Sequence, residues 1–286
     1  MSSTALVQRV PAQLFIVGSA LVQYVGAAIA VGAFAQIPPA SVAWWRVTTG
    51  AIILLAWRRP WRDGLTRKDL FRSLVFGVIL TLLNTTFYEA IARIPMGAAV
   101  SLEFLGPVAV AVVRGRGWAP RIAAVLAFAG VASIGGFGLD LSDRNTLIGV
   151  AWILAAAAMW AGYIVLGQKI ASQRSGITNL VLGCAFGSLV FAPITGRAGI
   201  PVLFDPHLLL IVGAVGLLST VLPYTLEAMA MSRLSAATFA LFTAMLPATS
   251  AIVGAVMLRQ SPAAGEVIGL VLISIAVWIA SRPESR

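Results

Sequence analysis

The amino-acid sequence predicts an all-α membrane protein with ten transmembrane helices arranged as two inverted five-helix repeats. The 286 residues are 59% hydrophobic and only 10% charged, whereas soluble domains are about half apolar and about a quarter charged. Uncharged apolar stretches recur along nearly the whole chain, and the two halves show weak internal similarity. A span needs about 20 apolar residues, and a helix satisfies all of its backbone groups within lipid, so these stretches predict helices.

Ten spans follow from the apolar stretches and from the residues that interrupt them. Pro38, Pro39, Pro95, Pro120 and Pro262 mark breaks because proline lacks the N–H that a continuing helix needs. The spans are expected at residues 12–35, 40–57, 70–92, 97–113, 120–138, 147–168, 179–195, 207–231, 235–258 and 263–281. The first is expected to be a retained helix, because it is too long for a typical cleaved signal region.

The positive charges predict the orientation. With the N-terminus inside, fifteen of the 20 Lys and Arg residues fall in cytoplasmic segments and four fall outside, while Arg46 lies within a span. Both termini are therefore expected in the cytoplasm. The net charge of +10 is explained by this topology and gives no reason to expect a nucleic-acid partner.

The internal similarity predicts two repeats, at residues 1–141 and 142–286. A shift of 140 residues superimposes identical residues at Thr85 and Thr225, Ala90 and Ala230, Arg93 and Arg233, and Pro107 and Pro247. An odd number of helices in each repeat gives the two copies opposite orientations. Inverted repeats are common in transporters, whose substrate site lies near the midplane between them.

Two segments carry a family resemblance: residues 101–112, SLEFLGPVAVAV, and residues 218–234, LSTVLPYTLEAMAMSRL. They resemble the drug/metabolite transporter superfamily, in particular the EamA-type branch of bacterial threonine and homoserine exporters. The resemblance implies a multi-pass protein of the bacterial inner membrane, with a central cavity lined mainly by the third, fourth, eighth and ninth spans. It also implies proton-driven export of small amino acids, so the expected partners are an amino acid, a proton and the lipid bilayer.

Four charged residues lie inside the apolar stretches, where a charge is costly without a partner, a wet cavity or a function. Arg46 and Glu103 lie at similar depths, so they form either a structural ion pair or part of a substrate site in which Arg46 binds a carboxylate. Glu103 and Glu227 are the expected proton-coupling residues, since a carboxylate in a low-dielectric cavity can exchange a proton near neutral pH. Glu227 could equally extend to the interface. Glu89 is expected to be structural, because Arg93 follows it by four residues.

Polar side chains at helical spacing predict a hydrophilic path. Thr81, Asn84 and Tyr88 share one helix face, and Thr220, Tyr224 and Glu227 share another. The threonines are better explained by hydrogen bonds to their own helices, whereas Asn84, Tyr88 and Tyr224 are expected at the cavity. Secondary candidates beside the cavity, which the resemblance suggests, are Gln23, Tyr24, Trp160 and Tyr163.

The sequence departs from the family at two places. Relatives typically carry Glu before the proline of the ninth span and a Gly-Glu pair near its end, where this chain has Leu246-Pro247 and Leu258-Arg259-Gln260. Proton coupling would therefore depend on Glu103 and Glu227.

Other functions are less consistent with the sequence. The single histidine, His207, and the single cysteine, Cys184, supply no catalytic metal site, so neither enzyme activity nor a cofactor is expected. The rival substrates are another amino acid, a polyamine or a cationic drug, and a structural or signalling membrane protein is the rival outside transport. Gly183-x-x-x-Gly187 and Gly265-x-x-x-Gly269 predict close helix packing within the monomer or, alternatively, a homodimer.

Overall fold

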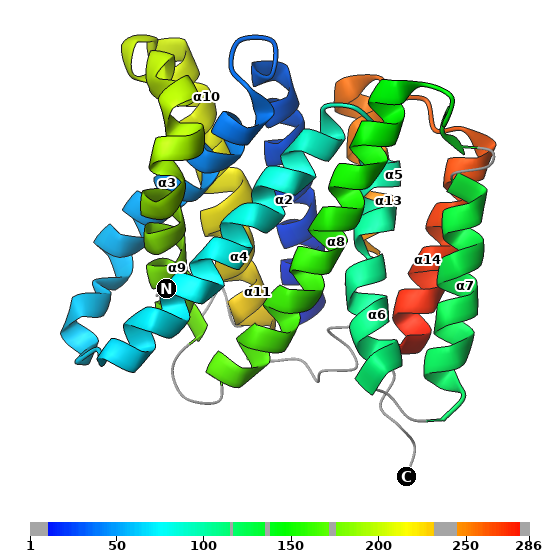
Figure 1. Cartoon of the computed structure of the whole chain (residues 1–286), viewed down its shortest axis with the longest axis horizontal. Helices are drawn as coiled ribbons and strands as arrows, with labels where there is room; N and C mark the ends of the chain where they lie inside the picture. The colour runs from blue at the N-terminus through cyan, green and yellow to red at the C-terminus, as the bar shows by residue number, and fades with distance from the viewer. Residues whose placement is uncertain (1–10, 115–116, 135–137, 172–175, 232–244, 281–286) are drawn as a thin grey trace.

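The described part of the chain is a bundle of helices in a computed structural model (Figure 1). The structure describes all residues except 1–10, 115–116, 135–137, 172–175, 232–244 and 281–286. Within the described ranges there are helices and short connections and no strand. The predicted all-α class is therefore confirmed.

The described residues of the first half form the α-helices α2 (Ala12–Ala33), α3 (Pro39–Arg58), α4 (Arg67–Ile91), α5 (Met96–Glu103), α6 (Leu105–Arg114) and α7 (Ala119–Ser133). Local sequence explains their ends. Pro39 is the first residue of α3, where a missing N–H costs nothing, and Thr66 begins α4 with a capping box to Asp69. A short 3₁₀ turn, Pro60–Asp63, connects α3 to α4.

The second half forms α8 (Arg144–Ala171), α9 (Gly176–Phe191), α10 (Pro206–Gly216), α11 (Leu222–Met231), α13 (Leu246–Leu258) and α14 (Ala264–Ala280). A π-helical turn, η3 (Ala192–Gly196), and a 3₁₀ helix, η4 (Arg197–Phe204), follow α9. Asp143 lies before α8 and accepts hydrogen bonds from the Thr146 N–H at 2.8 Å and from the Thr146 hydroxyl at 2.9 Å. These bonds stabilise the carboxylate and lower the pKa of Asp143.

Seven helical segments of the described chain are long and apolar enough to cross a membrane, and three shorter apolar helices, α7, α13 and α14, accompany them. The predicted ninth span began at residue 235, but residues 235–244 lie outside the described ranges. The chain is thus a multi-pass membrane protein. A total of ten spans and their inverted repeat stay predictions.

Prolines interrupt two spans that the sequence predicted as continuous. The helix over residues 97–113 breaks at Phe104, because the ring of Pro107 clashes with the carbonyl four residues earlier, which belongs to Glu103. Between α10 and α11 the chain forms a π-helical turn, η5 (Leu217–Val221), one turn before the cavity residue Tyr224. Here Pro223 has no N–H to offer the Ser219 carbonyl.

Two groups of neighbouring helices pack closely. At one edge of the bundle α7 lies beside α14, and in the middle α4 packs against α8 and α9 (Figure 1). The α4–α9 contact requires glycine, because a Cβ added to Gly77 would lie 2.1 Å from the Gly183 carbonyl oxygen. The first predicted glycine pair therefore packs within the monomer, and Cys184 is buried beside it.

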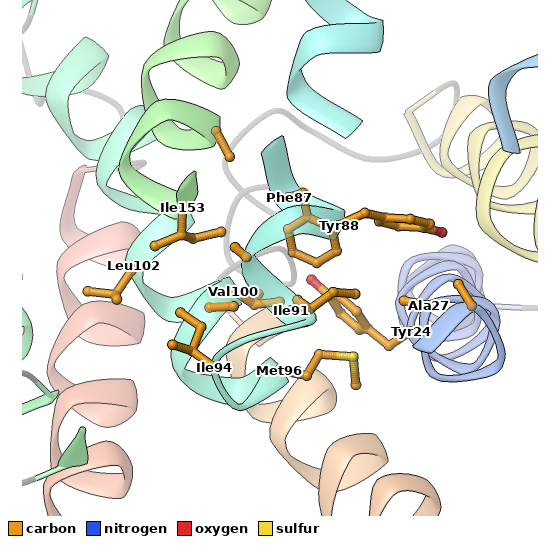
Figure 2. Packing of buried hydrophobic residues seen from close by; sticks show 14 of the residues in the cluster. Tyr24, Ala27, Phe87, Tyr88, Ile91, Ile94, Met96, Val100, Leu102 and Ile153 are labelled. Atoms are coloured by element: carbon orange, nitrogen blue, oxygen red, sulfur yellow. The ribbon is translucent and has the colours of Figure 1, made fainter. Parts of the chain in front are cut away.

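One hydrophobic core of buried residues extends through much of the described bundle, and part of it lies where α2, α4 and α5 meet. Figure 2 shows Tyr24 and Ala27 of α2 beside Phe87 and Tyr88 of α4, with Met96 of α5 close by. Tyr88 and Met96 are fully buried. Two residues of this core, Tyr24 and Phe87, also line the polar cavity described next.

Candidate functional site

A cavity of about 150 Å³ lies within the bundle, and a cavity of this volume is enough for a ligand the size of benzene. It is lined by both polar and apolar side chains. They are Gln23, Tyr24, Arg46, Leu83, Asn84, Phe87, Glu103, Trp160, Tyr163, Tyr224, Glu227 and Leu246. Nine of these are residues that the sequence singled out, although their roles stay predictions.

The lining residues come from both halves of the chain. In the first half α2, α3, α4 and α5 contribute, and in the second half α8, α11 and α13. The cavity therefore lies between segments on either side of the predicted repeat boundary at residue 141.

Arg46 is the one basic residue of the lining, and its side chain is held at three points. Its Nη2 donates to the Ser219 carbonyl at 2.6 Å, and its Nε donates to the Thr220 hydroxyl at 3.3 Å. The guanidinium carbon also lies 5.6 Å from the centre of the Tyr88 ring, within range of a cation–π interaction. These contacts hold the charge at the cavity although only 5% of the residue is exposed.

The structure contradicts the structural ion pair that was one of the two roles considered for Arg46. Arg46 and Glu103, both in the described part of the chain, form no ion pair. The guanidinium bonds to Ser219 and Thr220 instead of the Glu103 carboxylate. The two charges nevertheless share the cavity and interact electrostatically. Equal depth in two helices was insufficient to predict a contact, since their rotation and the position of a third element also matter.

Glu103 is the last residue of α5, directly before the break that Pro107 causes. Its neighbour Phe104 packs edge-on against Trp160, with ring centres 4.7 Å apart. This aromatic contact joins α5 to α8 beside the cavity. The break thus positions a carboxylate at the end of a helical segment that borders the cavity.

Glu227 lies on α11, two turns after Ser219, so about 12 Å separates the two along the helix. The Ser19 hydroxyl on α2 donates to its Oε1 at 2.9 Å. The carboxylate therefore faces α2 and the cavity. The cavity consequently has two acidic positions, Glu103 near Arg46 and Glu227 farther along.

Two predicted path residues do not line the cavity. Tyr88 is fully buried, and its ring lies against the Arg46 guanidinium, so it supports the site from behind. Thr81 is also fully buried and faces α9, where a Cβ on Gly187 would lie 2.1 Å from its hydroxyl. Helical spacing places Thr81 and Tyr88 on the same face of α4 as Asn84, but of these three residues only Asn84 lines the cavity.

The other polar lining residues have mixed surroundings. The Asn84 amide donates to the Leu80 carbonyl of its own helix at 2.7 Å, which leaves its oxygen for another partner. Tyr163 packs on Phe76 with ring centres 4.8 Å apart. Gln23, Tyr24 and Tyr224 complete the polar wall.

Glu89 has the structural role that the sequence predicted. Its Oε2 pairs with Arg93 at 2.6 Å, and its Oε1 accepts the Ala40 N–H at 3.1 Å. The second bond caps the start of α3 with a side chain of α4. Spacing along a single helix could not predict this contact between two helices.

The sequence analysis missed several residues of the site. Leu83, Phe87 and Leu246 form its apolar lining, and Ser19 and Ser219 hold its charged groups. Of these only Leu246 carried a signal, as the residue before the proline of the predicted ninth span. Small serines on apolar helices have no distinguishing pattern, so only the packing reveals them.

Comparison with known proteins identifies relatives along nearly the whole chain. The model of the EamA-like transporter family matches residues 147–282. The threonine/homoserine exporter RhtA of Escherichia coli is 32% identical over 279 residues, covering 96% of this chain and 94% of that protein. RhtA of Salmonella typhimurium is 34% identical over 251 residues, covering 88% and 84%. A solved crystal structure with 19% identity has a TM-score of 0.58 and covers 94% of this chain and 96% of its own, a likeness of fold.

Proposed function

Because the chain belongs to the EamA-like transporter family, we propose that it exports small neutral amino acids similar to threonine and homoserine across the bacterial inner membrane. The observation that carries this proposal is the cavity in which the Arg46 guanidinium and the Glu103 carboxylate lie together without an ion pair. Opposite charges that share a cavity but do not neutralise each other suit a ligand that also carries both charges.

A zwitterionic amino acid matches these groups one by one. A guanidinium has five N–H donors, so the bonds to Ser219 and Thr220 leave donors for a substrate carboxylate. The substrate ammonium would bind Glu103. Asn84 and Tyr224 offer hydrogen bonds to a side-chain hydroxyl, while Leu83, Phe87 and Leu246 contact its carbons.

Proton antiport is the proposed energy source, with Glu103 and Glu227 as the groups that exchange protons. Both carboxylates line the cavity, and neither has a basic residue bonded to it among the described contacts. Such a carboxylate can bind either a proton or a substrate ammonium. Competition between the two for one site is a simple route to exchange.

Transport would proceed by alternating access between two inverted five-helix repeats, residues 1–141 and 142–286, with both termini in the cytoplasm. Both halves of the chain contribute residues to the cavity, which supports a transport site between the two repeats. Lys and Arg are concentrated in alternate connections, which supports cytoplasmic termini.

A polyamine or a cationic drug is the main rival substrate, because two carboxylates attract cations. The positive charge of Arg46 argues against this rival, since a purely cationic ligand would have to bind beside a guanidinium that lines the same cavity. The two alternatives predict opposite results in a competition experiment.

The deciding experiment is counterflow of labelled threonine in proteoliposomes, with homoserine, other amino acids, putrescine and a cationic dye as competitors. We expect competition by homoserine and none by putrescine or the dye. Uptake only of the cations would support the rival. Absence of any counterflow by folded protein would favour a structural or signalling role.

The same vesicles test coupling when a pH gradient is imposed. The Glu103→Gln variant should lose its response to the gradient, because its side chain can no longer take up a proton. Glu89→Gln is the matched control: it makes the same change within the membrane, but outside the cavity. An unchanged gradient response in Glu103→Gln would rule out the proposed coupling role.

A further inference from the structure

The π-helical turn η5 is the irregular element nearest to Arg46. The Leu222 N–H bonds to the Leu217 carbonyl five residues back, which gives a wider turn than the α-helix. Pro223 supplies no N–H to the Ser219 carbonyl four residues earlier, and this carbonyl accepts a hydrogen bond from the Arg46 guanidinium.

Arg46 bonds to two acceptors of this turn. The bond from Nη2 to the Ser219 carbonyl is 2.6 Å long, in the range of a strong charge-assisted hydrogen bond. The second bond, 3.3 Å long, runs from Nε to the hydroxyl of the next residue, Thr220. Two bonds from one guanidinium to successive residues define its plane as well as its position.

Glycines allow α3 to come close enough for these bonds. A Cβ on Gly50 would lie 2.7 Å from Thr220 Cγ2, and a Cβ on Gly216 would lie 1.8 Å from Thr49 Oγ1. Neither distance is compatible with a real side chain. Since Gly50 lies one turn after Arg46 on α3, the contact brings the base of the arginine directly onto η5.

We propose that η5, opened by Pro223, is a positioning element that orients Arg46 for the carboxylate of the substrate. One side of the guanidinium bonds to the turn, and Arg46 also lines the cavity, so its remaining N–H donors are the groups proposed to bind the substrate carboxylate. The site therefore selects ligands with a carboxylate over their amides. This inference rests on the proposed function, because it needs an amino acid as the ligand.

Removal of each acceptor tests the proposal. The Thr220→Val variant keeps the shape of the side chain but loses the hydroxyl, whereas Thr220→Ser keeps the hydroxyl. The Pro223→Ala variant provides an N–H that competes with Arg46 for the Ser219 carbonyl. Its control is Pro193→Ala, which changes the proline of a second π-helical turn, η3, away from the cavity.

The measurement is the Kd of labelled threonine, and of threonine amide, for purified protein in lipid nanodiscs. We expect Thr220→Val and Pro223→Ala to raise the Kd of threonine about tenfold, as for a weakened bond to a charged group. Thr220→Ser and Pro193→Ala should bind like the wild type. Threonine amide should bind weakly and with nearly the same Kd to every variant, because it lacks the carboxylate.

A double-mutant cycle with Arg46→Gln separates positioning from general damage. If Pro223 acts through Arg46, then Pro223→Ala causes no further loss once Arg46 is replaced. An equal loss in both backgrounds, or wild-type affinity in Thr220→Val and Pro223→Ala, would overturn the proposal. If Pro223→Ala does not fold, the comparison of Thr220→Val with Thr220→Ser decides the question.

Failure of the proposed function gives a different result. A wild-type protein that binds none of the amino acids would refute both inferences together. Wild-type binding of threonine, with the acceptor variants unaffected, would refute only the role of η5.

Discussion

The close contact between α4 and α9 predicts a specific cost for adding one methyl group. In Gly77→Ala the new Cβ would start 2.1 Å from the Gly183 carbonyl oxygen, so the helices must separate by about 1.3 Å to reach an ordinary 3.4 Å contact. The obstacle is backbone, which cannot rotate away. Overpacking of this kind costs about 1–3 kcal/mol of the free energy of unfolding.

Gly32→Ala is the matched control. Gly32 is also helical, in α2, but a Cβ there would have no atom within 4 Å. Both variants gain about 1 kcal/mol from reduced backbone entropy, so the difference between them isolates the packing cost. Gly183→Ala should fall between the two, because its Cβ would meet the Phe76 ring at 2.8 Å, and a side chain can move.

Reversible unfolding in mixed detergent and dodecyl sulfate micelles, followed by circular dichroism, gives the free energies of unfolding of the wild type and the three variants. The expected order of stability is Gly32→Ala, wild type, Gly183→Ala and then Gly77→Ala. Since α4 supplies Asn84 and two further cavity residues, Gly77→Ala should also reduce counterflow. Equal unfolding midpoints for Gly77→Ala and Gly32→Ala would refute the reasoning.

Three further predictions concern hydrogen bonds to carboxylates. Ser19→Ala should lower kcat/KM for export about tenfold, because Glu227 loses its hydroxyl donor, and Ser19→Thr should restore it. Glu89→Ala should lower the free energy of unfolding by about 1–2 kcal/mol without changing substrate selectivity, since it removes the cap on the Ala40 N–H and the Arg93 ion pair. The pKa of Asp143 is lowered, so its charge stabilises the fold above its unfolded pKa of about 3.9, and this stability is lost as the pH falls through the folded pKa. In unfolding measured against pH, Asp143→Asn should therefore be less stable than the wild type at pH 7, and the difference should vanish in acid; a constant difference would contradict this.

Much of the architecture could be predicted from the sequence, because the responsible forces are local or depend on composition. Apolar length predicted the spans, and the observed α3, Pro39–Arg58, lies close to the predicted 40–57. Proline and capping residues marked helix ends without knowledge of any neighbour. The Glu89–Arg93 ion pair was also predictable, because residues four apart meet on any α-helix.

The candidate site was predictable only as a set of residues. Helical spacing and unusual charge identified most of the lining, but they could not tell which side of a polar stripe faces the cavity. Tyr88 and Thr81 belong to the same stripe as Asn84 and nevertheless point into the packed bundle.

The partner of Arg46 shows where sequence reasoning ended. The sequence alone predicted a guanidinium inside the membrane and a glutamate at similar depth. Only the tertiary structure decided that its bonds go to Ser219 and Thr220, on an element more than 170 residues away in the chain. The reason is that three conditions had to coincide: a proline four residues after Ser219, glycines that let two helices touch, and a helix rotation that turns Arg46 toward Ser219 and Thr220. Each condition has a local signal, but their meeting point depends on the packing of the whole bundle.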